Sequence, residues 1–429
     1  MRLPVPGSAE HTASCYAATA NDLREYPQLR GALSADVCVV GAGYTGISTA
    51  ICLAERGYDV CIVEANRVGW GASGRNGGQM IAGISGEQRI AKHHGPGIEK
   101  LLWNMRWAGH RIIRDRIDRY RIECDLKSGY LDVAIKARHL RDLEADFRRM
   151  SAHGCSEEFH LLSREETRSM IGTDAYCGSL LIMGNGHLHP LNLCTGEARA
   201  AASLGVKLYE RSPVESIRDG STASVITREG QVNAKFVVLA GNAYQQFNTK
   251  LRAQFFPVRS YIIATEPLTP AQADEINPRD VAVCDPNFIL EYFRLSADKR
   301  LLFGGRCNYF GEDPEIIRTQ LRPRMQRVYP QLAGIGIDFA WGGTIGVPLN
   351  RVPQLGRVAP NILYAQGYSG HGVNVTHLVG EILADTVSGT LERFDVFASI
   401  RPVRIPGAWL FANQMVSLGL LYYGLKDKL

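Results

Sequence analysis

A short apolar run that meets a glycine turn constrains the fold of this chain more than any other feature. Asp36–Val40 (DVCVV) suits a buried parallel strand, the turn GAGYTG follows at Gly41–Gly46, and the next residues recur at helical spacing. We expect this helix to end at Gly57, and a second buried strand, YDVCIVE, finishes on Glu64. Strand, glycine turn, helix, strand and acid in this order predict a dinucleotide-binding βαβ unit.

Each position of the turn has an expected role. Gly41 permits the tight turn, Gly43 lets the backbone approach a pyrophosphate, and Gly46 lets helix and strand pack closely. The helix start at Tyr44 and Thr45 offers unpaired N–H groups to phosphates. Glu64 is expected to accept hydrogen bonds from a ribose diol.

The stretch after the second strand, ANRVGWGASGRNGGQM, is rich in glycine and has no apolar periodicity. An NAD-binding chain usually continues at once into further βαβ units, whereas a glycine loop suits a chain that returns along a longer cofactor. Arg75 is the expected partner of a pyrophosphate, and the peptide groups of Asn76–Gln79 are expected to hydrogen-bond a flavin. FAD is therefore the predicted cofactor. Its predicted site in this region comprises Ala65, Arg67, Gly71, Ala72, Ser73, Arg75, Asn76, Gly77, Gly78 and Gln79.

Composition argues against several other classes of protein. The 429 residues carry mixed charges that sum to only +5, which gives no basic footprint for a nucleic acid. The ten cysteines show no CxxC or paired zinc spacing, so neither a disulfide framework nor a metal site is expected. The first thirty residues lack the pattern of a signal peptide, and we expect a reducing, cytoplasmic location.

Two helical segments have less specific interpretations. The run RWAGHRIIRDRIDRYR (Arg106–Arg121) alternates arginines with aspartates and predicts a solvated helix face. Residues 407–429 are apolar but interrupted by polar side chains, and they fall short of the roughly 18 unbroken apolar residues of a spanning helix. We expect a packed terminal helix there, with contact to a partner or a membrane surface as the alternative.

Further motifs are GHLHPLNL, VVLAGNAY, RLLFGGR and YAQGYSGHGVNVTHLVGE. Together with ADVCVVGAGYTGISTA and VEANRVGWGASGRNGGQM they resemble the D-amino-acid oxidase superfamily of FAD enzymes, which includes glycine oxidase and sarcosine oxidase. The resemblance runs nearly end to end. Within the superfamily it is strongest to amine oxidases of bacterial polyamine catabolism.

The resemblance implies an α/β fold in which a Rossmann-like FAD-binding domain is interleaved with an α+β substrate domain built on a mostly antiparallel sheet. The FAD-binding domain is expected to take residues 36–85, 186–245 and 341–390, and the substrate domain 86–185 and 246–340, with extensions at 1–35 and 391–429. The residues agree in part. The segment AKFVVLAGN (Ala234–Asn242) predicts a third buried strand, and SPVESIRDG and STASVITREG predict a pair of strands.

The segment NILYAQGYSGHGVNVTHLVGEILADTV predicts a strand, a glycine turn and an amphipathic helix. A helix start beside glycine binds anions, and in the resembling family it faces the pyrimidine carbonyl of the flavin. His187 and His189 lie two apart and would share one face of a strand, where we expect a structural role because no third metal ligand accompanies them. The remaining residues assigned to the cofactor are Val214, Ala240, Gly241, Gly370, His371, Gly372 and Val373.

The expected substrate walls come from the second domain. Tyr261 falls on one predicted strand, and Tyr292 and Arg294 share a face of a hairpin that turns at Ser296–Lys299. Arg294 suits a substrate carboxylate or, equally, a surface ion pair. The substrate-binding residues are predicted to be Tyr261, Glu291 and Arg294, and the catalytic positions His371, Tyr292 and Trp341. For His371 and Trp341 the alternatives are a loop histidine without a chemical task and a tryptophan that only packs.

The resemblance implies oxidation of a primary amine of the γ-glutamylputrescine type by hydride transfer to FAD. The products would be an aldehyde, ammonia and, with dioxygen, hydrogen peroxide. The alternative is a flavin dehydrogenase for an amino acid or a secondary amine that passes electrons to a carrier. A flavin-binding sensor without turnover is a third interpretation. No cysteine, Cys307 included, matches the covalent attachment site of some relatives, so FAD is expected to be held non-covalently.

Overall fold

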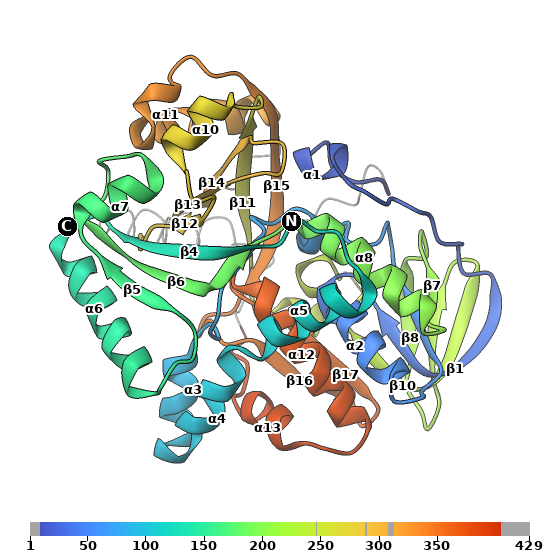
Figure 1. The fold of residues 1–429 in the computed structure, drawn as a ribbon. Coiled ribbons are helices and arrows are strands. Elements are labelled where there is room, and N and C mark those ends of the chain that lie inside the picture. The colour runs from blue at the N-terminus through green and yellow to red at the C-terminus, as the bar shows by residue number, and fades with distance from the viewer. Residues whose placement is uncertain (1–8, 246, 288–289, 308–312, 405–429) are drawn as a thin grey trace.

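The chain is built on two β-sheets, shown in the computed structural model of Figure 1. The structure describes residues 9–245, 247–287, 290–307 and 313–404. The first sheet contains, in spatial order, β16 (Gln354–Ala359), β17 (Ile362–Gln366), β10 (Gly230–Leu239), β1 (Gly31–Val40), β2 (Val60–Val63) and β7 (Lys207–Tyr209), with β9 (Ala223–Thr227) joined to β10 and β8 (Val214–Arg218) joined to β9. The second contains β15 (Ile337–Val347), β11 (Phe256–Thr265), β14 (Leu301–Cys307), β13 (Glu291–Leu295), β12 (Ala282–Cys284), β4 (Lys127–Ala134), β6 (Gly178–His187) and β3 (Gln79–Met80), with β5 (Phe159–Leu162) joined to β6.

The centre of the first sheet confirms the predicted parallel strands. β1 pairs in parallel with β2 on one side and with β10 on the other, and β10 pairs in parallel with β17. The four residues Val37–Val40 are buried because helices or further chain cover both faces. β8 and β9 are antiparallel neighbours, as their alternating sequences predict.

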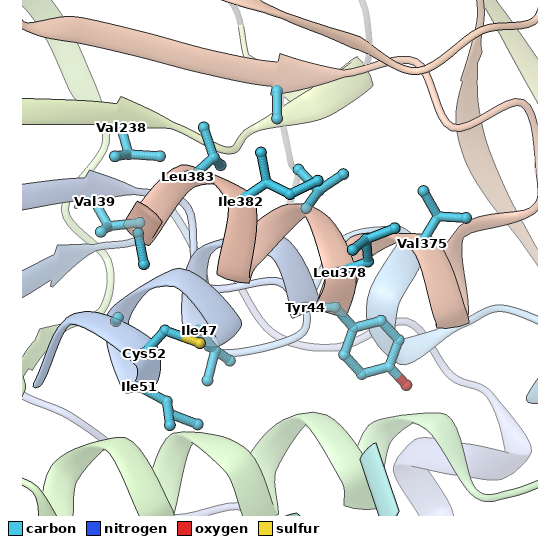
Figure 2. Close-up of a cluster of buried hydrophobic side chains, with 14 of the residues drawn as sticks. Val39, Tyr44, Ile47, Ile51, Cys52, Val238, Val375, Leu378, Ile382 and Leu383 are labelled. Atoms are coloured by element: carbon cyan, nitrogen blue, oxygen red, sulfur yellow. The ribbon is translucent and has the colours of Figure 1, made fainter. Parts of the chain in front are cut away.

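Four helices contribute most of the apolar core beside the first sheet: α2 (Tyr44–Ala54), α5 (Ala108–Tyr120), α8 (Pro190–Ser203) and α12 (Gly372–Val387). Figure 2 shows Ile47 of α2 and Leu378 and Ile382 of α12 in one apolar cluster. The helix after the glycine turn ends at Ala54, earlier than expected, because a short turn of backbone hydrogen bonds follows and Gly57 adopts a positive φ of 86°.

Two sequence expectations about helix faces are wrong. α12 is not amphipathic: it is buried along most of its length, since other helices cover it where solvent was expected. The arginine run on α5 is only partly solvated. Arg119 is exposed beside Glu55, but Arg116 is 3% exposed and pairs with buried Glu197 at 2.9 Å.

The second sheet is antiparallel except where β12 runs parallel to β4, which confirms the mostly antiparallel prediction. The predicted hairpin turns at Ser296–Lys299 between β13 and β14. One face packs on α11 (Pro314–Val328), where Phe293 and Phe303 meet Leu321 and Met325. The opposite face looks toward the first sheet (Figure 1).

The other helices lie around the sheets: α1 (Cys15–Ala18), α3 (Glu87–His94), α4 (Glu99–Arg106), α6 (Ala137–Ala152), α7 (Arg164–Ile171), α9 (Thr249–Arg252), α10 (Pro270–Ile276) and α13 (Glu392–Ala398), with single 3₁₀ turns at Ala72–Gly74, Pro96–Ile98, Asn242–Tyr244 and Pro330–Leu332. None of the helices in the described ranges is long and apolar enough to cross a lipid bilayer. The apolar segment 407–429, for which a terminal helix was predicted, lies outside the described residues.

Candidate active site

A cavity of about 1290 Å³ runs from the glycine turn of the first sheet to the face of the second. Its walls come from segments far apart in the sequence. The residues predicted to bind the cofactor that line it are Gly41, Gly43, Tyr44, Thr45, Glu64, Ala65, Gly71, Ala72, Ser73, Arg75, Asn76, Gly77, Gln79, Val214, Ala240, Gly241, Gly370, His371, Gly372 and Val373. Gly46, Arg67 and Gly78 are not among the lining residues.

The glycine turn at the nucleotide end is shaped by close backbone approaches. A Cβ on Gly46 would lie 1.9 Å from the carbonyl oxygen of Gly41, so only glycine lets helix and strand approach as they do. Gly41 itself has a φ of 111°, in the region that favours glycine. A Cβ on Gly43 would lie 2.8 Å from Ser73 Oγ, the atom that accepts a hydrogen bond from the Tyr44 N–H.

Glu64 lies where the ribose of a dinucleotide is expected. Its carboxylate accepts hydrogen bonds from the N–H groups of Ala42 at 2.8 Å and Asn66 at 2.9 Å. Burial raises the pKa of Glu64, and these two hydrogen bonds act in the opposite direction. Because a carboxylate has about four acceptor positions, Glu64 retains the capacity to bind a diol.

Arg67 has a different environment from the one predicted for it. Its side chain is 5% exposed and pairs with Glu210 at 2.9 Å, Glu10 at 2.9 Å and Glu25 at 3.4 Å. Those carboxylates draw it away from the cavity, and Arg67 thereby fastens the N-terminal segment to the first sheet. Gly78 likewise faces Arg294 and the carbonyl of Leu188 rather than the cavity.

Arg75 is held rigidly within the glycine loop. Its Nε and Nη2 donate to the carbonyl oxygen of Trp70 at 3.0 and 2.5 Å, and its Nη1 donates to that of Gly342 at 3.3 Å. Among the described residues, no carboxylate pairs with Arg75. A fixed, uncompensated positive charge thus lines the cavity, as an anionic ligand such as a pyrophosphate requires.

The far end of the cavity is formed by the start of α12. Gly370, with a φ of 84°, turns the chain into the helix at Gly372. Backbone N–H groups at a helix start attract negative charge. His371 precedes this helix without making a side-chain capping bond, and its buried Nε2 has no hydrogen-bond partner in the part of the chain that the structure describes. Burial lowers the pKa of His371, so its ring is a neutral group able to bond a ligand.

The second sheet contributes Tyr292 to the cavity but not the other predicted wall residues. Tyr292 lies across Gly77 and Gly304, and its hydroxyl is 3.2 Å from Ser260 Oγ. Trp341 shares this face but is covered: it is 2% exposed, and its Nε1 donates to the Arg75 carbonyl at 3.1 Å.

Tyr261 and Glu291 lie on the opposite face of the sheet. Tyr261 packs in the core beneath α11, and Glu291 lies 3.3 Å from both Arg324 and Arg327. The strands were predicted, but which of their two faces borders the cavity was not.

Arg294 shares the face of Tyr292, as predicted, but lies beneath the glycine loop. It is 2% exposed and donates to the carbonyl oxygens of Gly77 and Leu188, each at 2.8 Å, and to Tyr16 Oη at 3.1 Å. These bonds occupy its guanidinium, and it does not line the cavity. The structure therefore gives Arg294 the place of a support for the loop, not of a substrate ligand.

Several lining residues were missed from the sequence, among them Tyr130 and Asp132 of β4, where the Tyr130 hydroxyl donates to Asp132 at 3.0 Å. A carboxylate within the strand KSGYLDVA, two residues from a tyrosine on the same face, was the available signal. His187 has the structural role predicted for it: its Nε2 contacts the Asp280 carbonyl at 2.7 Å. No cluster of metal-ligating side chains occurs within the described ranges.

A glycine turn closed onto a helix start, a buried acid at the end of the second strand and a fixed positive charge at the cavity wall fit an FAD molecule, the cofactor of the flavin-dependent oxidoreductases. The chain belongs to this family: the family model described as FAD dependent oxidoreductase matches residues 36–386. FAD is accordingly its cofactor.

Among known proteins, the gamma-glutamylputrescine oxidoreductase of Escherichia coli (strain K12) is 42% identical over 423 residues, which cover 98% of this chain and 99% of that protein. The probable oxidoreductase OrdL of Haemophilus influenzae is 38% identical over 426 residues, 98% of each chain. The crystal structure of glycine oxidase from Geobacillus kaustophilus has a TM-score of 0.71 at 23% identity, over 86% of this chain and 100% of that one. This likeness confirms the predicted fold class.

Proposed function

We propose that this protein oxidises the primary amine of γ-glutamylputrescine or a closely similar compound, and that dioxygen reoxidises its flavin with formation of hydrogen peroxide. The observation that carries this proposal is the identity of 42% to a gamma-glutamylputrescine oxidoreductase, maintained over nearly the whole of both chains. A cavity that continues past the cofactor residues onto an apolar sheet face supports it.

In this proposal the first sheet holds the cofactor. The N–H groups around Gly43 and the charge of Arg75 bind the pyrophosphate, and Glu64 binds the adenosine ribose. The start of α12, with His371 and Gly372, places N–H groups toward the pyrimidine side of the ring, where backbone dipoles favour negative charge. When bound, FAD accepts a hydride from the carbon that carries the amine nitrogen.

The second sheet prepares the substrate. A free alkylamine titrates near pH 10, like lysine, but its nitrogen must be neutral before a hydride can leave the neighbouring carbon. Tyr292, Phe256, Val258 and Ile262 give the cavity an aromatic and aliphatic wall. Such a wall disfavours the charged ammonium and excludes water from the reacting end.

We further propose that FAD is held without a covalent bond. Cys284 lines the cavity, but burial and the neighbouring Asp132 and Asp285 raise the pKa of its thiol far above the ordinary value. A thiol kept protonated is a poor nucleophile. Denaturing the protein should therefore release all of its flavin into the supernatant.

The test is an anaerobic titration of the purified flavoprotein with γ-glutamylputrescine, putrescine and D-alanine, each followed by its visible spectrum. Bleaching of the flavin by γ-glutamylputrescine at the lowest concentration, and recovery with hydrogen peroxide when air is admitted, is the expected result. Bleaching by D-alanine alone would replace the amine proposal with amino-acid oxidation. Bleaching without recovery in air would show a dehydrogenase that needs another electron acceptor.

A further inference from the structure

Two carboxylates line the cavity among the described residues, and only one lies on the substrate side. Asp132 is on β4, next to Cys284 on β12, which in turn pairs with Tyr292 on β13. Because alternate residues of a strand share a face, Asp132 and Tyr130 border the same space as Tyr292. The other carboxylate, Glu64, lies at the nucleotide turn.

Asp132 forms no ion pair among the described residues; its side chain accepts one hydrogen bond, from the Tyr130 hydroxyl. A small cavity of about 60 Å³ is lined by Asp132 and by two arginines. Both are paired elsewhere: Arg106 lies 2.6 Å from Glu87, and Arg149 lies 2.8 Å from Asp146. A carboxylate without a cation, facing a mostly apolar cavity, is a site for a positively charged group.

Building on the proposed function, we propose that Asp132 binds the reacting ammonium group of the substrate and accepts its proton. The carboxylate oxygen that does not bond Tyr130 forms the new O–H bond. One N–H bond of the ammonium breaks, and its electron pair stays on the nitrogen. No electron passes to or from Asp132, and the amine is left neutral, as oxidation requires.

Burial brings the pKa of the Asp132 carboxyl and the pKa of the substrate ammonium closer together. In water, the pKa of an alkylammonium lies about six units above that of a carboxylic acid, so the proton stays on the nitrogen. Burial raises the pKa of Asp132 to about 6, although the Tyr130 hydrogen bond lowers it, and Asp146 adds a smaller upward contribution. The same apolar surroundings disfavour an ammonium ion. The titratable groups that face Asp132 are Tyr130 on its own strand, Cys284 on β12, Asp146 and Arg149 on α6, and Arg106 at the end of α4.

The test compares the wild-type flavoprotein with Asp132→Asn and with the control Asp285→Asn. Asp285 is also buried, with a pKa raised to about 7, but it does not line the cavity. The measurement is the anaerobic rate of flavin reduction between pH 5 and 9, with γ-glutamylputrescine and with N-acetylputrescine, which has the same primary amine but no glutamyl α-ammonium.

We expect the wild-type rate to fall as the pH drops through about 6. We expect Asp132→Asn to reduce the rate at least about 100-fold with both amines and to abolish this acid limb, while Asp285→Asn behaves as wild type. A rate within threefold of wild type, or an unchanged acid limb, would overturn the proposal. So would a loss confined to γ-glutamylputrescine, because Asp132 would then bind the glutamyl end.

If the Asp132→Asn protein loses its flavin, its reduction rate cannot be measured, and Asp132→Glu serves as the second variant. It keeps a carboxylate, and we expect it to keep the acid limb at a lower rate; an Asp132→Glu profile without that limb would count against the proposal. If no amine bleaches the wild-type flavin, the proposed function itself fails, and that result is distinct from any difference between the variants.

Discussion

Glu197 of α8 joins three helices behind the glycine turn, and replacing it with glutamine should weaken the whole first half of the fold. Its Oε1 lies 2.9 Å from Arg116 Nη1 on α5, and its Oε2 lies 3.1 Å from His377 Nε2 on α12. Glu197 and His377 are fully buried, and Arg116 is 3% exposed. The buried charges of Glu197 and Arg116 thus balance each other.

Glu197→Gln keeps the shape of the side chain but removes its charge. Within the described part of the chain, Arg116 would retain only neutral hydrogen-bond partners, the hydroxyl and carbonyl of Ser48 and the thiol of Cys52. Breaking a buried ion pair in this way costs about 3–5 kcal/mol of folding free energy. With an unfolding entropy of roughly 2.1 cal/mol/K per residue, a chain of 429 residues would lose about 3–6 °C in Tm.

The assay is thermal unfolding of the FAD-loaded protein, followed by the fluorescence of released flavin. Glu55→Gln is the matched control, because Glu55 accepts hydrogen bonds from Arg119 and Tyr120 of the same helix α5 but at the surface. An exposed pair of this kind contributes about 0–1 kcal/mol. Equal melting temperatures for the two variants would refute the reasoning that burial makes the Glu197 pair important.

The effect should also depend on pH. Burial alone would raise the pKa of Glu197, but the charges of His377 and Arg116 outweigh it, and the pKa lies below the ordinary value of 4.5. A lowered pKa in the folded state stabilises the protein above the unfolded-state value and loses this effect as the pH falls toward the folded-state value. The Tm difference between wild type and Glu197→Gln should therefore be full at pH 7 and shrink below about pH 4.5.

Three other substitutions test separate parts of the site. Gly46→Ala forces a Cβ into backbone and should abolish most FAD binding, measured as visible absorbance per protein, whereas Gly97→Ala, with nothing within 4 Å, should bind FAD normally. Tyr130→Phe removes a hydrogen bond to the charged form of Asp132 and should move the acid limb of flavin reduction up by about 0.5–1 pH unit; an unmoved limb would contradict that link. Arg294→Lys should weaken FAD retention and lower Tm, because a lysine cannot reproduce the fork of bonds under the glycine loop. A selective rise in KM for γ-glutamylputrescine, with FAD binding unchanged, would argue that Arg294 contacts substrate after all.

The nucleotide half of the fold was predictable because its constraints are local. A Cβ on Gly46 would meet the carbonyl of Gly41, only five positions earlier, and the strands on either side of the turn contain continuous apolar runs. The arrangement of Arg75 was only half predictable. Its place in the glycine loop follows from the sequence, but the carbonyl of Gly342 that helps to hold it comes from a strand far along the chain.

The half built on the second sheet was less predictable for a related physical reason. Alternation divides a strand into two faces but does not say which face meets the cavity, and Tyr261 therefore fell on the right strand and the wrong side. Arg116 was taken for a solvated side chain because its buried partner, Glu197, belongs to a different helix. Whether a charge is exposed or buried depends on such distant segments.

Among the side chains that the structure describes on the Tyr292 face of the second sheet, Arg294 and Asp132 are charged and have opposite environments. Arg294 directs its hydrogen bonds to carbonyl and hydroxyl oxygens under the glycine loop, so its charge supports this loop and does not border the cavity. Asp132 accepts one hydrogen bond from the described residues, donated by the Tyr130 hydroxyl, and it borders the cavity. A site for an α-amino acid would need the reverse on this face, since the carboxylate of such a substrate requires a cation there. With the cation buried and the anion presented, this face favours a substrate that arrives amine first, which is what the proposed oxidation of a γ-glutamylated diamine requires.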